Sequence, residues 1–272
     1  MKLLVTVLLA GTYAIGGPIV TVTNNATTLT DTLLGAGITL SGTPTLTEAG
    51  AQAGTFTNGP SLVGFSSGIL LSSGDAASAA GNYTGGNLPS TNEHGAGDSS
   101  LSALVGGAAT YDAATLQFSF IPDASMVTFQ YTFASAEYPQ FVDSQYNDVF
   151  AFIVNGTNYA LVPGTTTAVS VDNVNALTNS AYFNKYNSAG DALPYGGETV
   201  VLTFTAPVNA GMVNSIMLGI ADSSDPYLDS AVFIQAGTFT TNPGSSAPEP
   251  ATFSLIGAGL LGLAIARRRL RS

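Results

Sequence analysis

Residues 114–135 read ATLQFSFIPDASMVTFQYTFAS, and apolar side chains alternate with polar ones along both halves of this stretch. Leu116, Phe118 and Phe120 fall on one face of the first half. In the second half, alternate positions from 127 to 133 are Val, Phe, Tyr and Phe. A period of two is the pattern of a β-strand that buries one face. The stretch therefore predicts two half-buried strands.

The flanking sequence predicts more strands of the same kind. Residues 149–154 (VFAFIV) are apolar on both faces, which favours a central strand. Asn155-Gly156 follows and predicts a tight hairpin, because both residues accept positive φ angles, with a return strand in NYALV (158–162). Other predicted strands are 38–42, 68–73, 199–205, 215–221 and 230–240. We find no long amphipathic helix before Ala251, so the fold class is all-β, as an antiparallel β-sandwich or jelly-roll-like domain.

The distribution of charge excludes one class of partner. From Gly16 to Ala247, 16 acidic residues accompany a single lysine, which gives a formal charge of −15. Such a surface repels phosphate backbones, so no nucleic acid is expected as a partner, whereas divalent cations are attracted. The chain has no cysteine, which excludes disulfides and thiolate metal sites.

The two ends of the chain are predicted to be targeting segments. Residues 1–17 contain one lysine, an apolar run and then small residues, which is the pattern of a signal peptide; a buried first strand is the alternative. Residues 251–266 carry no charge and form a predicted transmembrane helix. Its 16 residues span about 24 Å, which is short for a hydrocarbon core of about 30 Å. The basic tail 267–272 is expected to stay in the cytoplasm.

A short motif precedes the apolar helix. We divide the remainder of the chain into a body, 18–240, and a linker, 241–250, that ends in Pro-Glu-Pro. The two prolines block helix propagation and keep this strip extended just outside the bilayer. The candidate sorting residues are Pro248, Glu249, Pro250, Arg267, Arg268 and Arg269.

This C-terminal arrangement resembles a PEP-CTERM sorting signal. The resemblance implies recognition and cleavage near Pro-Glu-Pro by an exosortase, a membrane processing enzyme. The chain would be anchored in the inner membrane by its C-terminal helix before processing. It would then be released or retained at the cell surface or outside the cell.

The body resembles the choice-of-anchor L domain. The matching stretches are GFSSGILLSSGD (64–75), DSSL (98–101), ATLQFSFIP (114–122), FQYTFASAEYP (129–139), NDVFAFIVNG (147–156) and ADSSDPYLDSAVFI (221–234). The family implies an extracellular module of bacterial surface or matrix proteins, and no molecular activity comes with it. Members commonly carry two consecutive Glu before the Tyr, whereas this chain has Ala136 and then Glu137.

Acidic residues beside the predicted strands suggest a cation site. Glu137 follows one strand, Asp148 precedes another, and Asp222 and Asp229 lie between two more. If the loops at one end of the sandwich converge, these four carboxylates meet, and such hard oxygen ligands suit Ca²⁺. The alternative is that they are solvated loop carboxylates.

Enzyme chemistry has little support in the sequence. His94 is the only histidine and lies in a stretch rich in Gly and Ser, which predicts an exposed loop position. We therefore expect a non-enzymatic surface or matrix protein associated with extracellular polysaccharide. Two alternatives stay open: a Ca²⁺-stiffened carbohydrate-binding module, and a glycoside hydrolase that uses Glu137 with Asp148. The tyrosines available to stack on sugars are Tyr138, Tyr146, Tyr182, Tyr186 and Tyr195.

Overall fold

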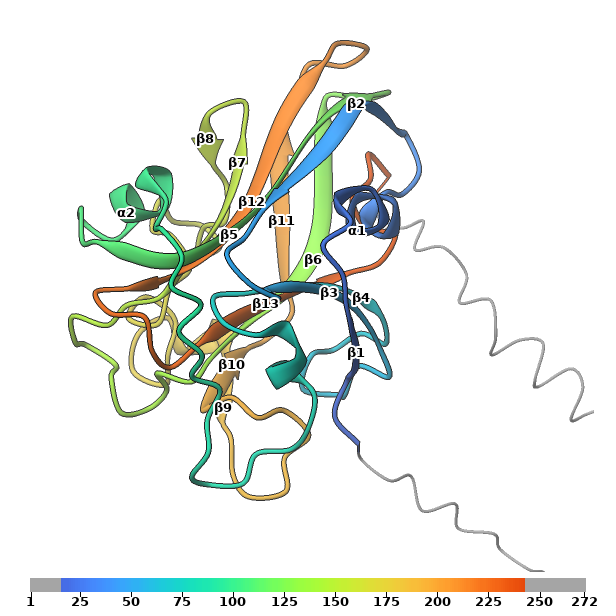
Figure 1. Cartoon of the computed structure of the whole chain (residues 1–272). Helices are drawn as coiled ribbons and strands as arrows, with labels where there is room; N and C mark the ends of the chain where they lie inside the picture. Colours follow the sequence, from blue (N-terminus) through green and yellow to red (C-terminus); the bar gives the residue numbers. More distant parts are fainter. Residues whose placement is uncertain (1–15, 243–272) are drawn as a thin grey trace, which may run out of the picture.

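The computed structural model describes residues 16–242, which form two antiparallel sheets with short helices at their margins (Figure 1). The predicted all-β class is confirmed. The signal peptide (1–17) falls almost entirely outside the described residues, and the sorting residues, the transmembrane helix and the basic tail lie wholly outside them. Within residues 16–242, no helix has the length and apolar character needed to cross a membrane.

The larger sheet has eight strands in the order β1-β3-β4-β13-β6-β10-β9, with β11 also paired to β6. Its strands are β1 (Ile19–Val22), β3 (Ala53–Thr57), β4 (Gly68–Ser72), β6 (Met126–Ser135), β9 (Phe183–Tyr186), β10 (Gly197–Thr199), β11 (Leu202–Pro207) and β13 (Ser230–Gln235). The smaller sheet has five strands in the order β2-β5-β12-β7-β8. Its strands are β2 (Ile38–Thr47), β5 (Thr110–Pro122), β7 (Val149–Val154), β8 (Thr157–Asn158) and β12 (Asn214–Ser223).

Helical structure in the described range is short and lies outside the sheets. The two α-helices are α1 (Ala26–Leu33) and α2 (Ser99–Leu104), and two 3₁₀ turns cover Ala76–Ala79 and Ser180–Tyr182. Asp98 caps α2 by accepting from the backbone N–H of Ser100 and Leu101.

Aromatic side chains fill the space between the sheets. Phe129 and Tyr131 point inward from β6, and Phe150 and Phe152 meet them from β7. The rings of Phe129 and Phe152 lie edge to face with centroids 3.9 Å apart, and Phe204 stacks on Phe129 at 4.4 Å. The alternation in residues 114–135 thus buries the face that it predicted.

Three predicted strands differ from the observed ones. The hairpin at Asn155-Gly156 is confirmed, with φ of 48° and 85°, but its return strand is only Thr157–Asn158. The chain then pairs with itself, because Val162 donates to the carbonyl of Thr167. Residues 199–205 are divided between β10 and β11, beside an irregular register at Glu198/Thr199. The predicted strand 230–240 ends at Gln235, since Gly237 has a φ of 67° and redirects the chain toward α1.

Candidate functional site

Three of the four predicted carboxylates gather at one end of the sandwich. Asp148 immediately precedes β7, Asp222 lies near the end of β12, and Asp229 immediately precedes β13. All three are buried, with exposed fractions of 1%, 0% and 0%. We call Asp148, Asp222 and Asp229 the acid cluster. The charges of Asp148 and Asp229 both act on Asp222, so the three lie near one another, and they are buried instead of solvated.

Asp148 links the two sheets through its carboxylate. Its Oδ2 accepts a hydrogen bond from the Ser230 hydroxyl at 2.7 Å, and its Oδ1 accepts from the Ser223 backbone N–H at 2.9 Å. Ser230 belongs to the larger sheet and Ser223 to the smaller one. Both oxygens of Asp148 are thus used for structure.

The other two members of the acid cluster carry oxygens without hydrogen-bond partners. Neither carboxylate oxygen of Asp222 has a hydrogen-bond partner, and Oδ2 of Asp229 also has none. Oδ1 of Asp229 accepts from the backbone N–H of Thr91 at 2.8 Å. A buried carboxylate without donors is costly, so the cluster needs a proton or a cation to neutralise it.

Burial shifts the pKa of each member upward. Burial is the largest cause in all three, and it raises the pKa of Asp148 and of Asp229 to about 7. The pKa of Asp222 is raised well above its ordinary value by burial and then by the Asp148 carboxylate, against the opposing effect of the Ser73 hydroxyl. No lysine of the described chain neutralises the acid cluster, because its single lysine, Lys185, pairs with Asp191 at 2.6 Å.

Another buried acid, Asp112, was missed by the sequence reasoning. Asp112 is 0% exposed and has a φ of 47°. Its carboxylate accepts from the backbone N–H of Glu93 at 2.9 Å and from that of Gly95. Together with the Thr91–Asp229 bond, these contacts hold part of the Gly- and Ser-rich stretch 74–110 against the sheet ends. The sequence signal that could have indicated a buried acid is the position of Asp112 within the strand β5, among apolar residues.

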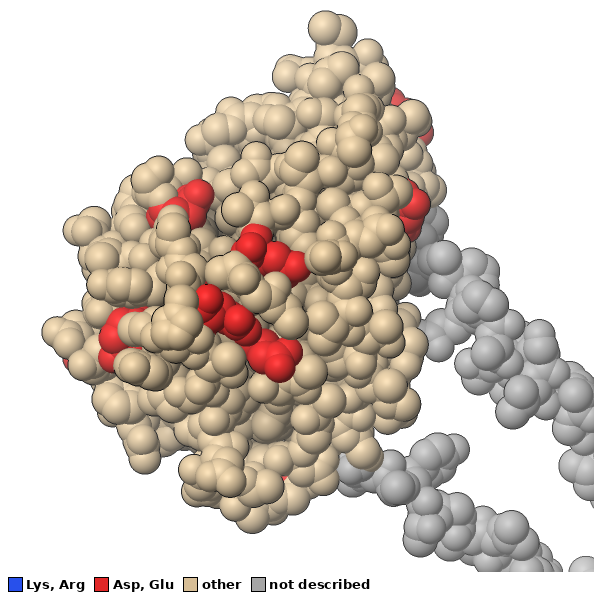
Figure 2. Space-filling view, viewed as in Figure 1, with Lys and Arg blue, Asp and Glu red and all other residues tan. Residues whose placement is uncertain are grey.

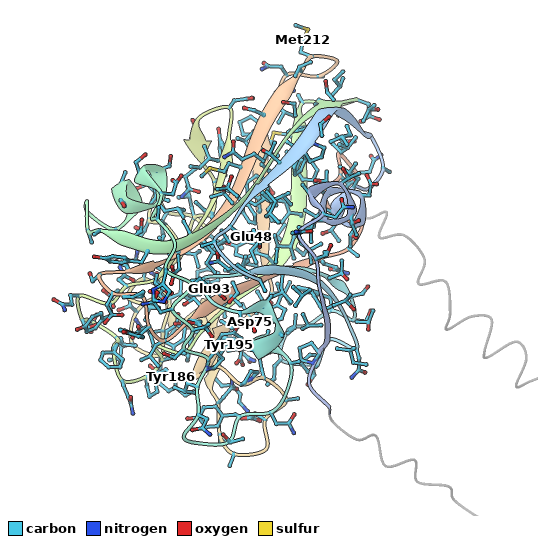
Figure 3. All side chains as sticks on the ribbon, viewed as in Figure 1. Glu48, Asp75, Glu93, Tyr186, Tyr195 and Met212 are labelled. Atoms are coloured by element: carbon cyan, nitrogen blue, oxygen red, sulfur yellow. The ribbon has the colours of Figure 1, made fainter. Side chains whose placement is uncertain are left out.

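Further acids lie at the surface near the cluster. Glu48, Glu93 and Asp75 follow one another down the middle of Figure 3. Burial, Asp75 and Asp112 raise the pKa of Glu93, and Glu93 in turn contributes to the raised pKa of Asp229. On the described part of the face shown in Figure 2, acidic side chains form several patches and no basic side chain is visible. The field at this end of the molecule therefore favours the approach of cations.

Glu137, the fourth predicted carboxylate, lines a pocket that no member of the acid cluster borders. It follows β6 and is 2% exposed, and its Oε2 has no hydrogen-bond partner. Burial, then Asp148, then Asp225 raise the pKa of Glu137 to about 9. The pocket measures about 210 Å³ and is lined by Glu137, Phe141, Tyr146, Asp225, Tyr227 and Leu228. We call this hollow the Glu137 pocket.

The side chains alone do not complete a metal site. Among residues 16–242, no group of three or more His, Cys, Asp or Glu side chains converges closely enough to hold a metal ion. The predicted four-carboxylate Ca²⁺ site is therefore not preformed. Further oxygens from hydroxyls, carbonyls or water would have to join any cation there.

Residues 20–240 match the model of the choice-of-anchor L domain. The chain belongs to the choice-of-anchor L family. A second model, the PEP-CTERM protein-sorting motif, matches residues 246–269, a range that contains all six candidate sorting residues. Both resemblances are thus confirmed, and no curated protein and no solved structure matches the chain. The sorting motif identifies an exported protein that is anchored to the membrane and then processed by an exosortase.

The choice-of-anchor L domain of this chain places the predicted tyrosines in different surroundings. Tyr138 and Tyr195 are buried, with exposed fractions of 1% and 0%, so they cannot stack on a sugar. Tyr182 and Tyr186 are half-buried, whereas Tyr146 borders the Glu137 pocket. The tyrosine that is most exposed there, Tyr227 at 53%, was not among those predicted.

Ala136 and His94 complete the comparison with the predicted residues. Ala136 is 1% exposed and packs in an apolar group with Phe233 and Tyr195, so this chain has no second carboxylate beside Glu137. His94 is exposed on the surface loop, as its surroundings in the sequence predicted.

Proposed function

We propose that this exported protein is a non-catalytic component of the cell surface or extracellular matrix, associated with polysaccharide, and that its choice-of-anchor L domain is stabilised by Ca²⁺. The single observation that carries the Ca²⁺ proposal is Asp222, a buried carboxylate with no hydrogen-bond partner on either oxygen. Asp229 adds an unpartnered oxygen of its own. A divalent cation would neutralise both groups.

Ca²⁺ suits this position better than a smaller ion. It takes six to eight oxygen ligands in irregular geometry, and carbonyls and water can supply those that carboxylates do not. Asp148, Asp222 and Asp229 come from different strand ends, so one ion among them would tie the two sheets together. Support for Glu137 as a fourth ligand is weaker, because it lines the Glu137 pocket, which no member of the acid cluster borders.

The glycoside hydrolase alternative is supported less well than a structural role. A hydrolase needs two carboxyl groups that reach the substrate. Asp148 is 1% exposed, and both of its oxygens are engaged by Ser223 and Ser230. The carbohydrate-binding alternative is favoured by one observation, the Glu137 pocket with its aromatic walls.

Thermal melts test the Ca²⁺ proposal. We expect Ca²⁺ to raise the midpoint of the chelator-treated protein, since a ligand at 100 times its Kd stabilises the native state by about 2.7 kcal/mol, or several degrees. The shift should disappear in Asp222→Asn and persist in Asp31→Asn, a matched change at an exposed position of α1. Equal midpoints of the wild-type protein in Ca²⁺ and in chelator would reject the proposal.

A further inference from the structure

The Glu137 pocket combines rigid walls with an unused carboxylate. Its rim comes from the segment after β6 and from the turn between β12 and β13. The backbone N–H of Glu137 donates to the Ser135 hydroxyl at 3.0 Å, and the N–H of Phe141 donates to the carbonyl of Glu137 at 3.0 Å. The backbone of Glu137 is thus fixed, while Oε2 of its side chain is buried and has no partner.

The second wall carries the other charge of the pocket. Asp225 borders it, and its Oδ1 accepts from the backbone N–H of Tyr227 at 3.1 Å. Asp148 and Asp172 also act electrostatically on Glu137. In the described chain the only lysine is engaged by Asp191, so nothing basic balances these acids. A cation in the pocket would be attracted by these acids and would in turn favour the ionised form of Glu137.

The remaining walls favour an organic cation over a bare metal ion. Phe141 and Tyr146 meet edge to face with centroids 5.3 Å apart, and Tyr227 and Leu228 complete an apolar rim. Aromatic rings attract ammonium groups through their negative faces. A volume of about 210 Å³ is smaller than the usual pocket for a drug-sized ligand, which limits the occupant to about one small ring.

We propose that the Glu137 pocket binds an amino sugar, with the ammonium group on Glu137 and Asp225 and the apolar face of the pyranose ring against Tyr227. A sugar fits better than a lysine side chain, because a lysine has no flat apolar face for the exposed ring of Tyr227. This inference rests on the proposed association with polysaccharide and names the sugar class that the chain would recognise.

Titration of the full protein with the methyl glycoside of glucosamine tests this assignment. We expect saturable binding that is at least 10-fold tighter than that of the N-acetylated glycoside or of methyl glucoside. A monomeric probe is needed, because a glucosamine polymer would bind to any surface as acidic as this one. Equal binding of the three glycosides, or binding only of a lysine-containing peptide, would overturn the proposal.

Matched variants assign the binding to the pocket. Glu137→Gln replaces the carboxyl that a bound ammonium group would ionise by a neutral amide of similar shape, so it should weaken glucosaminide binding at least 10-fold. Tyr227→Ala should weaken binding about as much. The controls Asp31→Asn and Leu177→Ala, at exposed positions outside the pocket, should stay within twofold of wild type. Unchanged binding in both pocket variants would contradict the proposal, and so would an equal loss in the controls.

The titrations are run once in excess Ca²⁺ and once in chelator. Binding in both conditions supports the pocket whether or not Ca²⁺ stabilises the protein, so a failure of the melts and a failure of the sugar titration are separate results. Loss of glucosaminide binding in Ca²⁺ alone would show that the metal occupies the pocket, which would overturn the amino-sugar assignment.

Discussion

Asp222 and Glu198 are two acids with 0% exposure in the same domain, yet their surroundings differ. Glu198 in β10 accepts from the side-chain amide of Asn187 at 2.7 Å and from that of Asn184 at 2.8 Å. Asp222 makes no hydrogen bond of ordinary geometry on either oxygen, and the Ser73 hydroxyl is the one donor that acts on its pKa. This fold can therefore supply side-chain amides as hydrogen-bond donors to a buried acid. The acid cluster, without such amides, remains open to a proton or a cation.

The pKa values express the same contrast. Burial raises the pKa of Glu198 to about 7, and the two amides and Lys185 restrain that rise. Burial and Asp148 raise the pKa of Asp222 well above its ordinary value, and of its neighbours only the Ser73 hydroxyl is a clear opposing influence. Donors from the chain therefore keep a buried carboxylate closer to its ionised form.

The largest expected effect is a dependence of stability on pH that Ca²⁺ reduces. The pKa values of Asp148, Asp229 and Glu198 are about 7 in the folded state, above their ordinary values, and that of Glu137 is about 9. The native state therefore keeps protons that the unfolded chain releases, so the free energy of unfolding falls as pH rises from about 5 to 9.

Melts across this pH range check the effect. In chelator we expect the midpoint to fall on the order of 10 °C between pH 5 and pH 9. With Ca²⁺ the fall should be shallower, because the ion favours ionised carboxylates in the native state. Identical slopes in the two conditions would mean that protons alone neutralise the acid cluster.

The next effect comes from removing a donor from Glu198, which then resembles Asp222. Asn187→Ala removes the amide that also donates to the carbonyl of Tyr195 at 3.0 Å. Hydrogen bonds to charged groups contribute about 1.5–3 kcal/mol, so we expect a loss of about 2–3 kcal/mol in chemical denaturation at pH 8. The control Asn184→Ala, at an exposed position, should cost less than half as much. Equal losses would show that burial does not set the strength of these bonds.

The smallest effect on stability is expected from a change at Asp222 itself. Asp222→Asn replaces the unpartnered carboxylate by a neutral group of the same shape. In chelator at pH 8 we expect this variant to be as stable as wild type or more stable by about 1 kcal/mol, because it no longer buries a potential charge. A loss above 2 kcal/mol would mean that the ionised carboxylate is satisfied by contacts within the chain.

The sequence predicted the Asp222 side of this comparison and the strands around it, but it gave no indication of Glu198. The alternation in 114–135 predicts β5 and β6, and the positions of Asp148, Asp222 and Asp229 beside strands predict that they meet. Strands β1, β3 and β9 were missed because they are short and lie at or beside sheet edges. The amides around Glu198 were missed because their approach depends on the irregular register between β9 and β10, which no local pattern encodes.

The burial of the acids was the other feature beyond sequence reasoning. Carboxylates in loops are normally solvated, which is why Asp148, Asp222 and Asp229 were weighed as surface ligands. For Asp229, the stretch 74–110 folds over the strand ends through the bond from Thr91, and bonds from Glu93 and Gly95 hold the same stretch to Asp112. Asp148 is enclosed between the sheets by its bonds to Ser223 and Ser230. Contacts between residues so far apart in the chain cannot be predicted from local patterns in one amino-acid sequence.

Calorimetric titration of Ca²⁺ into the chelator-treated protein at pH 7.5 tests the role of the acid cluster most directly. We predict saturable uptake of one Ca²⁺ per chain at this cluster and loss of this uptake in Asp222→Asn. Binding should release protons, which appears as a measured heat that changes with the ionisation enthalpy of the buffer. The absence of saturable uptake, or the same uptake in Asp222→Asn as in wild type, would show that the buried carboxylates are neutralised by protons and hold no cation.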